Sequence, residues 1–197
     1  CLAAGIKEFC HETHIYKVVE GTINEPVENI FNRISFEKPD IIGLSCYIWN
    51  IKSVVLLGKM LREAFPDLTI VLGGPEVSYN PEEVLKNFDW CDFIISGEGE
   101  YPFAVLCDAI KSKESFHIPG LCFKNGNDII INPPYIADGE PPSPYCDKYF
   151  ENLHGRIAYL ETSRGCPYSC AFCLSGRCGG VRFFDIKRAK EEMLLLA

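Results

Sequence analysis

The sequence of 197 residues lacks several features that define whole classes of protein. No apolar run approaches the roughly 20 residues that a membrane helix needs, so we expect no transmembrane span and no membrane partner. No block of Lys and Arg is dense enough to neutralise a row of phosphates, and the formal net charge is -8, so we expect no nucleic-acid partner. The chain begins at Cys1 without a basic and apolar leader, and we therefore expect the N-terminus to be trimmed.

Cysteine, by contrast, is abundant. The sequence has 11 cysteines, an odd number, and three of them (Cys166, Cys170 and Cys173) lie within eight residues while the rest are scattered. Scattered cysteines in odd number favour free thiols in a reducing compartment over a secreted disulfide framework. We therefore expect a cytoplasmic protein.

Hydrophobic periodicity alternates between buried strands and amphipathic helices up to about residue 113. We expect strands at 14–19, 40–46, 68–72 and 93–96, and helices at 2–11, 26–34, 51–65, 81–88 and 101–111. This order predicts an α/β fold with a doubly wound parallel sheet of the Rossmann or flavodoxin-like type, in which ligands bind at the carboxyl ends of the strands.

The pattern changes beyond this region. Prolines concentrate between 115 and 150, and Asn125-Gly126 between two apolar runs predicts a β-hairpin. A further strand is expected at 157–161 and a helix at 186–196, with the cysteine cluster between them. We therefore expect an α/β domain at 1–114 whose first strand precedes the chain, a proline-rich connector with a hairpin at 115–155, and the start of a truncated second domain at 156–197.

The spacing Cys166-x3-Cys170-x2-Cys173 brings three thiolates within reach of one inorganic centre. Three ligands leave one iron of a cubane cluster open, which allows that iron to bind a small molecule. The alternative is a closed zinc site that adds Cys178, although zinc ribbons usually use paired Cys-x2-Cys knuckles and this segment has one. With Phe172 directly before the third cysteine, the segment resembles the signature of the radical S-adenosylmethionine (SAM) superfamily.

This resemblance implies a 4Fe-4S cluster on the three cysteines, with Phe172 on the side where SAM binds. The open iron would chelate SAM, and an electron from a donor such as flavodoxin or ferredoxin would cleave it to a 5′-deoxyadenosyl radical. The strand at 157–161 would then be the first strand of a TIM-like radical SAM barrel. The substrate, small or macromolecular, is not indicated, and we expect little turnover without the rest of the barrel.

Three predicted strand ends carry unusual loops, with the sequences Ser-Cys-Tyr-Ile-Trp-Asn, Leu-Gly-Gly-Pro-Glu-Val-Ser and Ser-Gly-Glu-Gly-Glu. Each could be a tight turn, but together they resemble the cobalamin-binding domain that precedes many radical SAM proteins. The resemblance implies that a corrinoid pocket is lined by Ser45, Tyr47, Gly73, Gly74, Gly97 and Gly99. The Asp-x-His-x-x-Gly motif that supplies a histidine to cobalt in many such domains is absent. Glu98 and Glu100 are expected to cap a helix and interact with its dipole.

These observations predict a cobalamin-binding radical SAM enzyme that cleaves SAM reductively, with methyl transfer as one outcome. Two alternatives stay open. The first is a radical SAM enzyme without a corrinoid, such as a methylthiotransferase-like protein, and the second is a zinc-stabilised, flavodoxin-like binding module without catalysis. The absence of the Asp-x-His-x-x-Gly motif is also explained if the domain keeps the fold but binds no corrinoid. It is explained equally if a segment before this chain supplies the cobalt ligand.

Overall fold

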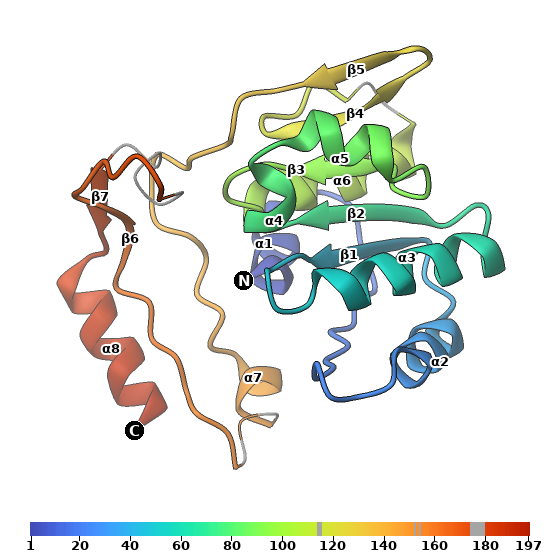
Figure 1. Ribbon diagram of the computed structural model, residues 1–197. Helices are drawn as coiled ribbons and strands as arrows, with labels where there is room; N and C mark the ends of the chain where they lie inside the picture. The colour runs from blue at the N-terminus through green and yellow to red at the C-terminus, as the bar shows by residue number, and fades with distance from the viewer. Residues whose placement is uncertain (114–115, 152, 154, 174–179) are drawn as a thin grey trace. The chain divides into compact units, whose positions relative to one another are not determined.

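The structure is a computed structural model that describes residues 1–113, 116–151, 153, 155–173 and 180–197. Two compact units are present, Leu2–Ile136 and Ala137–Ala197, and each is described by itself (Figure 1). Within the described residues, no helix combines the length and apolar character needed to cross a membrane.

The first unit is built on a five-stranded sheet. Its strands are β1 (Ile41–Ser45), β2 (Thr69–Gly73), β3 (Phe93–Ile95), β4 (Leu121–Asn125) and β5 (Asp128–Ile131), and they lie in the order β1-β2-β3-β4-β5. The first three strands are parallel, while β4 pairs antiparallel with β3 and β5 antiparallel with β4. The predicted α/β fold is therefore confirmed, with a mixed sheet in place of a wholly parallel one.

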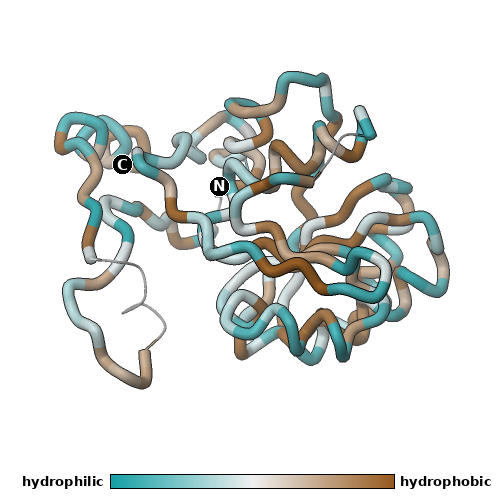
Figure 2. The backbone as a smooth tube through the Cα atoms, turned by 90° about the horizontal axis from the view of Figure 1, so that it is seen from above, coloured by the Kyte–Doolittle hydropathy of each residue, from teal (hydrophilic) through white to brown (hydrophobic). Residues whose placement is uncertain are grey.

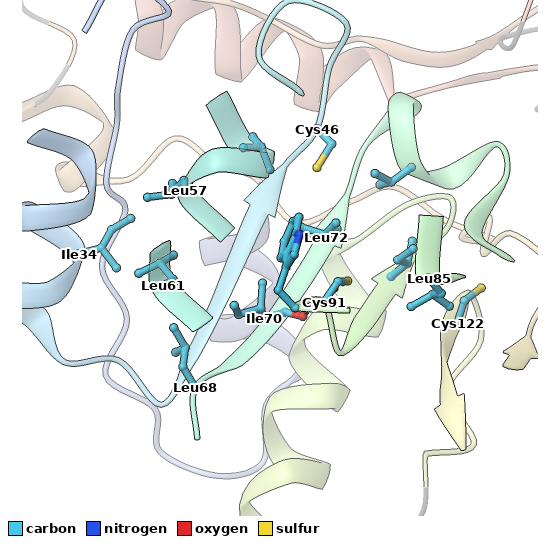
Figure 3. Close-up of a cluster of buried hydrophobic side chains, with 14 residues drawn as sticks. Ile34, Cys46, Leu57, Leu61, Leu68, Ile70, Leu72, Leu85, Cys91 and Cys122 are labelled. Carbon is cyan, nitrogen blue, oxygen red and sulfur yellow. Dashed lines mark hydrogen bonds between the residues drawn. The ribbon is translucent and has the colours of Figure 1, made fainter. Parts of the chain in front are cut away.

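Helices cover both faces of this sheet. They are α1 (Leu2–Phe9), α2 (Val27–Glu37), α3 (Ile51–Ala64), α4 (Pro75–Ser78), α5 (Pro81–Asn87) and α6 (Glu100–Ser112). One buried cluster joins α2, α3 and α5 to Ile70 and Leu72 of β2 (Figure 3), and a second joins α1 and α6 to Val71 of the same strand. Because neighbouring residues of β2 point to opposite faces, this strand is buried on both sides, as its continuous apolar sequence predicts. Figure 2 shows the apolar residues of this unit concentrated along the strands.

The strand predicted at 14–19 is wrong. Residues 13–20 have no regular secondary structure, and the side chains of Ile15 and Val18 are exposed. A strand needs a hydrogen-bonded neighbour, and this segment pairs with neither β1 nor any other strand of the described sheet. Side-chain contacts hold the segment instead: Val19 packs on the first cluster and Arg33 donates to the carbonyl of Glu20 at 2.8 Å.

The hairpin at Asn125-Gly126 is confirmed, because β4 and β5 pair directly across this turn. It is, however, more than an element of a connector: Cys122 lies opposite Ile94, so the hairpin extends the sheet of the first unit. The turn residues predict a hairpin but carry no information on which strand it joins. The domain limits expected at 114/115 and 155/156 stay predictions.

The second unit contains α7 (Asp147–Glu151), β6 (Ser163–Cys166), β7 (Gly180–Phe183) and α8 (Ile186–Leu196), with β6 and β7 antiparallel. The strand predicted at 157–161 is wrong, since the strand begins at Ser163 and the side chains of Ile157 and Tyr159 are exposed. The helix predicted at 186–196 is confirmed. Asp185 caps it by accepting the backbone N–H groups of Lys187 and Arg188 at 2.8 and 3.1 Å.

Candidate functional site

The three parallel strands end side by side. Ser45 at the end of β1 lies in register with Gly73 of β2, and Gly73 with Ile95 of β3. The loops that follow therefore start at one carboxyl edge, the edge at which open α/β sheets bind ligands. All six residues expected to line a corrinoid pocket lie on it: Ser45, Tyr47, Gly73, Gly74, Gly97 and Gly99. Their contact with a corrinoid stays a prediction.

The loop after β1 presents a rigid apolar surface. Asn50 fixes its shape, because its Oδ1 accepts the Tyr47 N–H at 2.8 Å and its Nδ2 donates to the Ser45 carbonyl at 2.9 Å. The rings of Tyr47 and Trp49 stack with centroids 4.6 Å apart and planes 7° apart. Trp49 is 63% exposed and Ile48 is 76% exposed. No role was expected for Trp49 from the sequence alone. Its position among bulky apolar residues directly after a strand end was the signal that could have identified it as part of the site.

Two of the glycines are explained by contacts within the protein. Gly74 has φ +106°, and a Cβ there would lie 2.6 Å from the Cys46 carbonyl oxygen. Gly97 has φ +92°, and a Cβ there would overlap the carbonyl oxygen of Tyr135. Both positions therefore need glycine so that one backbone can approach another. Gly73 is less crowded, since the nearest atom to an added Cβ is 3.8 Å away.

Hydrogen bonds join the three loops to one another. The Cys46 N–H donates to the Gly73 carbonyl at 2.7 Å, linking the ends of β1 and β2. Ser78 Oγ donates to the Ile95 carbonyl at 3.2 Å, and Ser96 Oγ donates to the Ser78 carbonyl at 3.1 Å. The edge is therefore held in one arrangement by the protein alone, which lowers the ordering cost of binding a ligand.

Two long helices begin at this edge. The N-cap residues of α3 and α6 are Asn50 and Gly99, and neither gives a side-chain hydrogen bond to the first turn of its helix. Ile51 N–H already donates to the Tyr47 carbonyl at 3.0 Å, and Pro102 in the first turn of α6 has no N–H, so the groups of α3 that can donate to polar groups of a ligand are the N–H groups of Lys52 and Ser53. Glu100 is buried in the first turn of α6, where a carboxylate interacts favourably with the helix dipole, as expected. The expected capping by Glu98 and Glu100 is wrong, because the N-cap residue is Gly99 and no side chain caps the helix. Glu98 donates its backbone N–H to the Tyr135 carbonyl at 2.8 Å.

The described carboxyl-edge loops contain no histidine. His11 and His14 follow α1 and bond to Asp108, far along α6 from its start, and His117 precedes β4. His154 lies outside the described residues. The donor set at the edge thus fits a corrinoid that receives no imidazole from these loops, with the flat pair of Tyr47 and Trp49 available to cover a planar ring.

In the second unit the cysteines lie at and after the end of β6, and not after the strand that was predicted at 157–161. Cys166 is the last residue of β6, and Cys170 and Cys173 lie in the turn after it, where the Cys173 N–H donates to the Cys170 carbonyl at 3.1 Å. Cys170 is exposed, while Cys166 and Cys173 are half-buried. Cys178, the extra ligand of the zinc alternative, lies outside the described residues. The loop therefore offers one exposed and two half-buried thiols.

The base of this loop is well ordered by its own contacts. Arg164 binds Glu161 through two hydrogen bonds of 3.0 Å, a paired geometry that fixes the strand before Cys166. Gly165 has φ +98° and crosses so close to Gly180 of β7 that a Cβ would overlap the Gly180 carbonyl oxygen. Phe172, expected on the SAM side, is 93% exposed beside Cys173.

Comparison with known proteins identifies the family of the first unit. The B12 binding domain family matches residues 1–107. The chain is 32% identical over 170 residues to 2-(S-pantetheinyl)-carbapenam-3-carboxylate methyltransferase of Streptantibioticus cattleyicolor, and 31% identical over 173 residues to the cobalamin-dependent radical SAM methyltransferase TokK of Streptomyces tokunonensis. Each match covers 79% of this chain and 25% of the relative.

Among solved structures, the cobalamin-dependent SAM radical enzyme OxsB, with aqua-cobalamin and SAM bound, superposes with a TM-score of 0.74 at 23% identity, over 88% of this chain and 25% of that one. The likeness establishes a shared fold. This chain spans about a quarter of the length of these proteins. Because the family match covers more than half of the sequence and extends through all three carboxyl-edge loops, the chain belongs to the B12-binding domain family.

Proposed function

We propose that the intact protein is a cobalamin-dependent radical SAM enzyme, and that its reaction is a methyl transfer. The observation that carries the proposal is the coincidence in one chain of a B12-binding domain and an open Cys-x3-Cys-x2-Cys loop at the end of a strand. The two relatives named above are methyltransferases, and TokK is described as a cobalamin-dependent radical SAM enzyme.

Cys166, Cys170 and Cys173 would hold a 4Fe-4S cluster through their three thiolates, which would leave a position on the cluster open for SAM. When bound, the cluster provides the electron that cleaves SAM, and cobalamin provides a carrier for a methyl group. Exposure of the Cys170 side chain and of Phe172 leaves one side of the loop accessible to a molecule the size of SAM. A flavodoxin or ferredoxin is the proposed electron donor.

The carboxyl edge has the task of holding the corrinoid. Tyr47 and Trp49 give a flat apolar surface that excludes water from one face of the ring, and Ser45 and the first turn of α3 give hydrogen-bonding groups for its polar substituents. The backbone bonds between the loops set the distance between these groups before binding.

A single zinc ion makes a different demand on the cysteines. With Zn–S bonds of about 2.3 Å, tetrahedral sulfurs lie about 3.8 Å apart. The described residues that bring three ligand atoms within 4.8 Å of one another are Cys10, His14 and Asp108, and the cysteine loop does not gather its sulfurs in this way. The closed zinc site also needs Cys178, which lies outside the described residues, so the variants below decide between the two.

The test compares two neighbouring cysteines in the intact protein, reconstituted with iron and sulfide without oxygen. We expect about four irons per chain, and release of 5′-deoxyadenosine or S-adenosylhomocysteine from SAM. Cys173→Ala should lose both the iron and the SAM products, while Cys178→Ala should keep both. Equal loss in the two variants would favour a closed four-cysteine site and reject the proposal.

Binding of hydroxocobalamin to the same protein tests the other half. Saturable binding with one corrinoid per chain supports the proposal. Cluster-dependent SAM cleavage without any corrinoid binding would instead indicate the radical SAM enzyme of the first alternative.

A further inference from the structure

A second group of metal-binding side chains lies away from both of these sites. Cys10 follows α1, His14 lies four residues later, and Asp108 lies on α6. One thiol sulfur, one imidazole nitrogen and one carboxylate oxygen from these residues lie within 4.8 Å of one another. Cys10 is half-buried, and the side chains of His14 and Asp108 are each 16% exposed, so the group is largely shielded from solvent.

The carboxylate of Asp108 is already oriented. Its Oδ2 accepts the backbone N–H of His11 at 2.7 Å. Its Oδ1 accepts the backbone N–H of Glu12 at 3.4 Å and lies 2.6 Å from Nε2 of His14. Backbone N–H groups thus orient both oxygens, and Oδ1 also faces the imidazole. A ligating carboxylate whose second oxygen is hydrogen-bonded in this way is the usual arrangement around a bound metal.

Close packing of α1 on α6 brings the three groups together. A Cβ on Gly5 would overlap the carbonyl oxygen of Glu100, so glycine at this position lets the two helices approach. Farther along, the rings of Phe9 and Tyr101 meet edge to face with centroids 5.5 Å apart. The position of Cys10 beside α6 is therefore set by the helix pair.

We propose that Cys10, His14 and Asp108 form a zinc site, with a water molecule as the fourth ligand. Thiolate, imidazole and carboxylate are the three side chains that zinc uses, and three protein ligands with one open position form a known class of zinc site. Bond lengths of 2.0 to 2.3 Å place tetrahedral ligand atoms about 3.3 to 3.8 Å apart, so small side-chain movements from the present arrangement suffice.

Zinc binding displaces protons from the ligands. Burial, as the larger cause, and the nearby Asp108 carboxylate, as the smaller, raise the pKa of the Cys10 thiol to about 11. Without metal the thiol is therefore protonated, and it donates to the Ala104 carbonyl at 3.4 Å. Binding of Zn²⁺ releases this proton. The hydrogen that joins His14 Nε2 to Asp108 Oδ1 in the metal-free protein must also leave that nitrogen, by transfer to Nδ1 through solvent, so that Nε2 and the carboxylate can bind the ion. The thiolate and the carboxylate then neutralise the charge of the ion.

The site is separate from the carboxyl edge. Asp108 lies eight residues after the start of α6, which at 1.5 Å per residue is about 12 Å along the helix. A metal there would join the end of α1 and the following segment to α6. We therefore assign it a structural role, independent of the function proposed above.

Cobalt(II) is the probe, because tetrahedral cobalt has intense visible bands and a thiolate ligand adds a near-ultraviolet charge-transfer band. The parent protein is the full chain with Cys166, Cys170 and Cys173 replaced by Ser, so that the cysteine loop does not bind the probe. We expect one cobalt per chain with both signals, displaced by zinc, and a higher melting temperature with zinc than without it.

In this parent, Cys10→Ser should remove the charge-transfer band, and His14→Gln and Asp108→Asn should each weaken cobalt binding by about tenfold or more. Cys146→Ser, which replaces an exposed cysteine of the second unit, is the matched control and should change nothing. Circular dichroism without metal checks that each variant folds, and His14→Gln, in a segment without regular structure, remains informative if Cys10→Ser unfolds. Absence of tetrahedral cobalt bands in the parent, or persistence of the charge-transfer band in Cys10→Ser, would overturn the proposal.

Discussion

Replacement of Gly97 by alanine tests how the carboxyl edge is held together. In the structure this glycine has φ +92°, and its backbone lies against Tyr135. Two hydrogen bonds accompany the contact: Glu98 N–H donates to the Tyr135 carbonyl at 2.8 Å, and Tyr135 N–H donates to the Ser96 carbonyl at 2.9 Å. An alanine Cβ would overlap the Tyr135 carbonyl oxygen, so the two segments must separate.

The cost has two parts. A positive φ costs a residue with a Cβ about 1 to 2 kcal/mol, and loss of the two hydrogen bonds adds about 1 kcal/mol each. We therefore expect Gly97→Ala to lower the free energy of unfolding by about 3 to 4 kcal/mol. Gly126→Ala is the matched control, because Gly126 also has positive φ, +61°, but no atom lies within 4 Å of an added Cβ. It should cost about 1 to 2 kcal/mol.

Urea unfolding followed by tryptophan fluorescence measures both variants. Both tryptophans lie in the first unit, and Trp90 is 2% exposed, so its emission reports on this unit. With a slope of about 2 kcal/mol per molar urea, Gly97→Ala should lower the midpoint by about 1.5 M or more. Equal midpoints for the two variants would refute the argument, because the contact with Tyr135 would then contribute nothing.

Two further predictions concern the first unit. Trp49→Ala should weaken hydroxocobalamin binding by about tenfold or more without changing the urea midpoint, because Trp49 is exposed and stacks only at the carboxyl edge. The control Phe36→Ala, at an exposed aromatic residue of α2, should change neither the binding nor the midpoint. Unaltered binding in Trp49→Ala would contradict the role of the aromatic pair. Burial raises the pKa of Cys46, Cys91 and Cys107 to about 12 from 9.0. Above pH 9 these thiols lose their protons in the unfolded chain but keep them in the folded protein, so their contribution to the free energy of unfolding is present below pH 9 and lost as the pH rises toward 12. Cys91→Ala should reduce this loss by about 1.4 kcal/mol per pH unit. The absence of any decline in urea midpoint between pH 8.5 and about 10.5 would contradict the effect of burial on these thiols.

Local signals predicted the elements whose stability is local. The helix at 186–196 could be located because Asp185 caps it and because its apolar residues recur at helical spacing. The hairpin could be located because Asn-Gly forms its turn. The strands predicted at 14–19 and 157–161 failed because β-patterned sequence forms a strand only where a neighbour supplies hydrogen bonds, and no local signal specifies the neighbour.

The candidate site also has features that the sequence predicts and features that it does not. Parallel βα order places the loops after β1, β2 and β3 at one edge, so their meeting could be predicted. The contacts of Gly74 with Cys46 and of Gly97 with Tyr135 join residues far apart in the sequence, and they explain glycines that the sequence suggested were open to a ligand. The cluster of Cys10, His14 and Asp108 could not be predicted either, because Asp108 follows His14 by 94 residues.

Strand β1 also has a consequence for handling the protein. Its sequence Ile-Ile-Gly-Leu-Ser is apolar and uncharged, it lies at the end of the strand order, and its side chains are half-buried or exposed. The bonds from Thr69 N–H to the Asp40 carbonyl and from Cys46 N–H to the Gly73 carbonyl use alternate residues of this segment, so the intervening amides of Ile41 and Gly43 point outward. An uncharged strand edge with outward amides pairs readily with another such edge, so residues 1–197 handled by themselves at high concentration should begin to aggregate at β1.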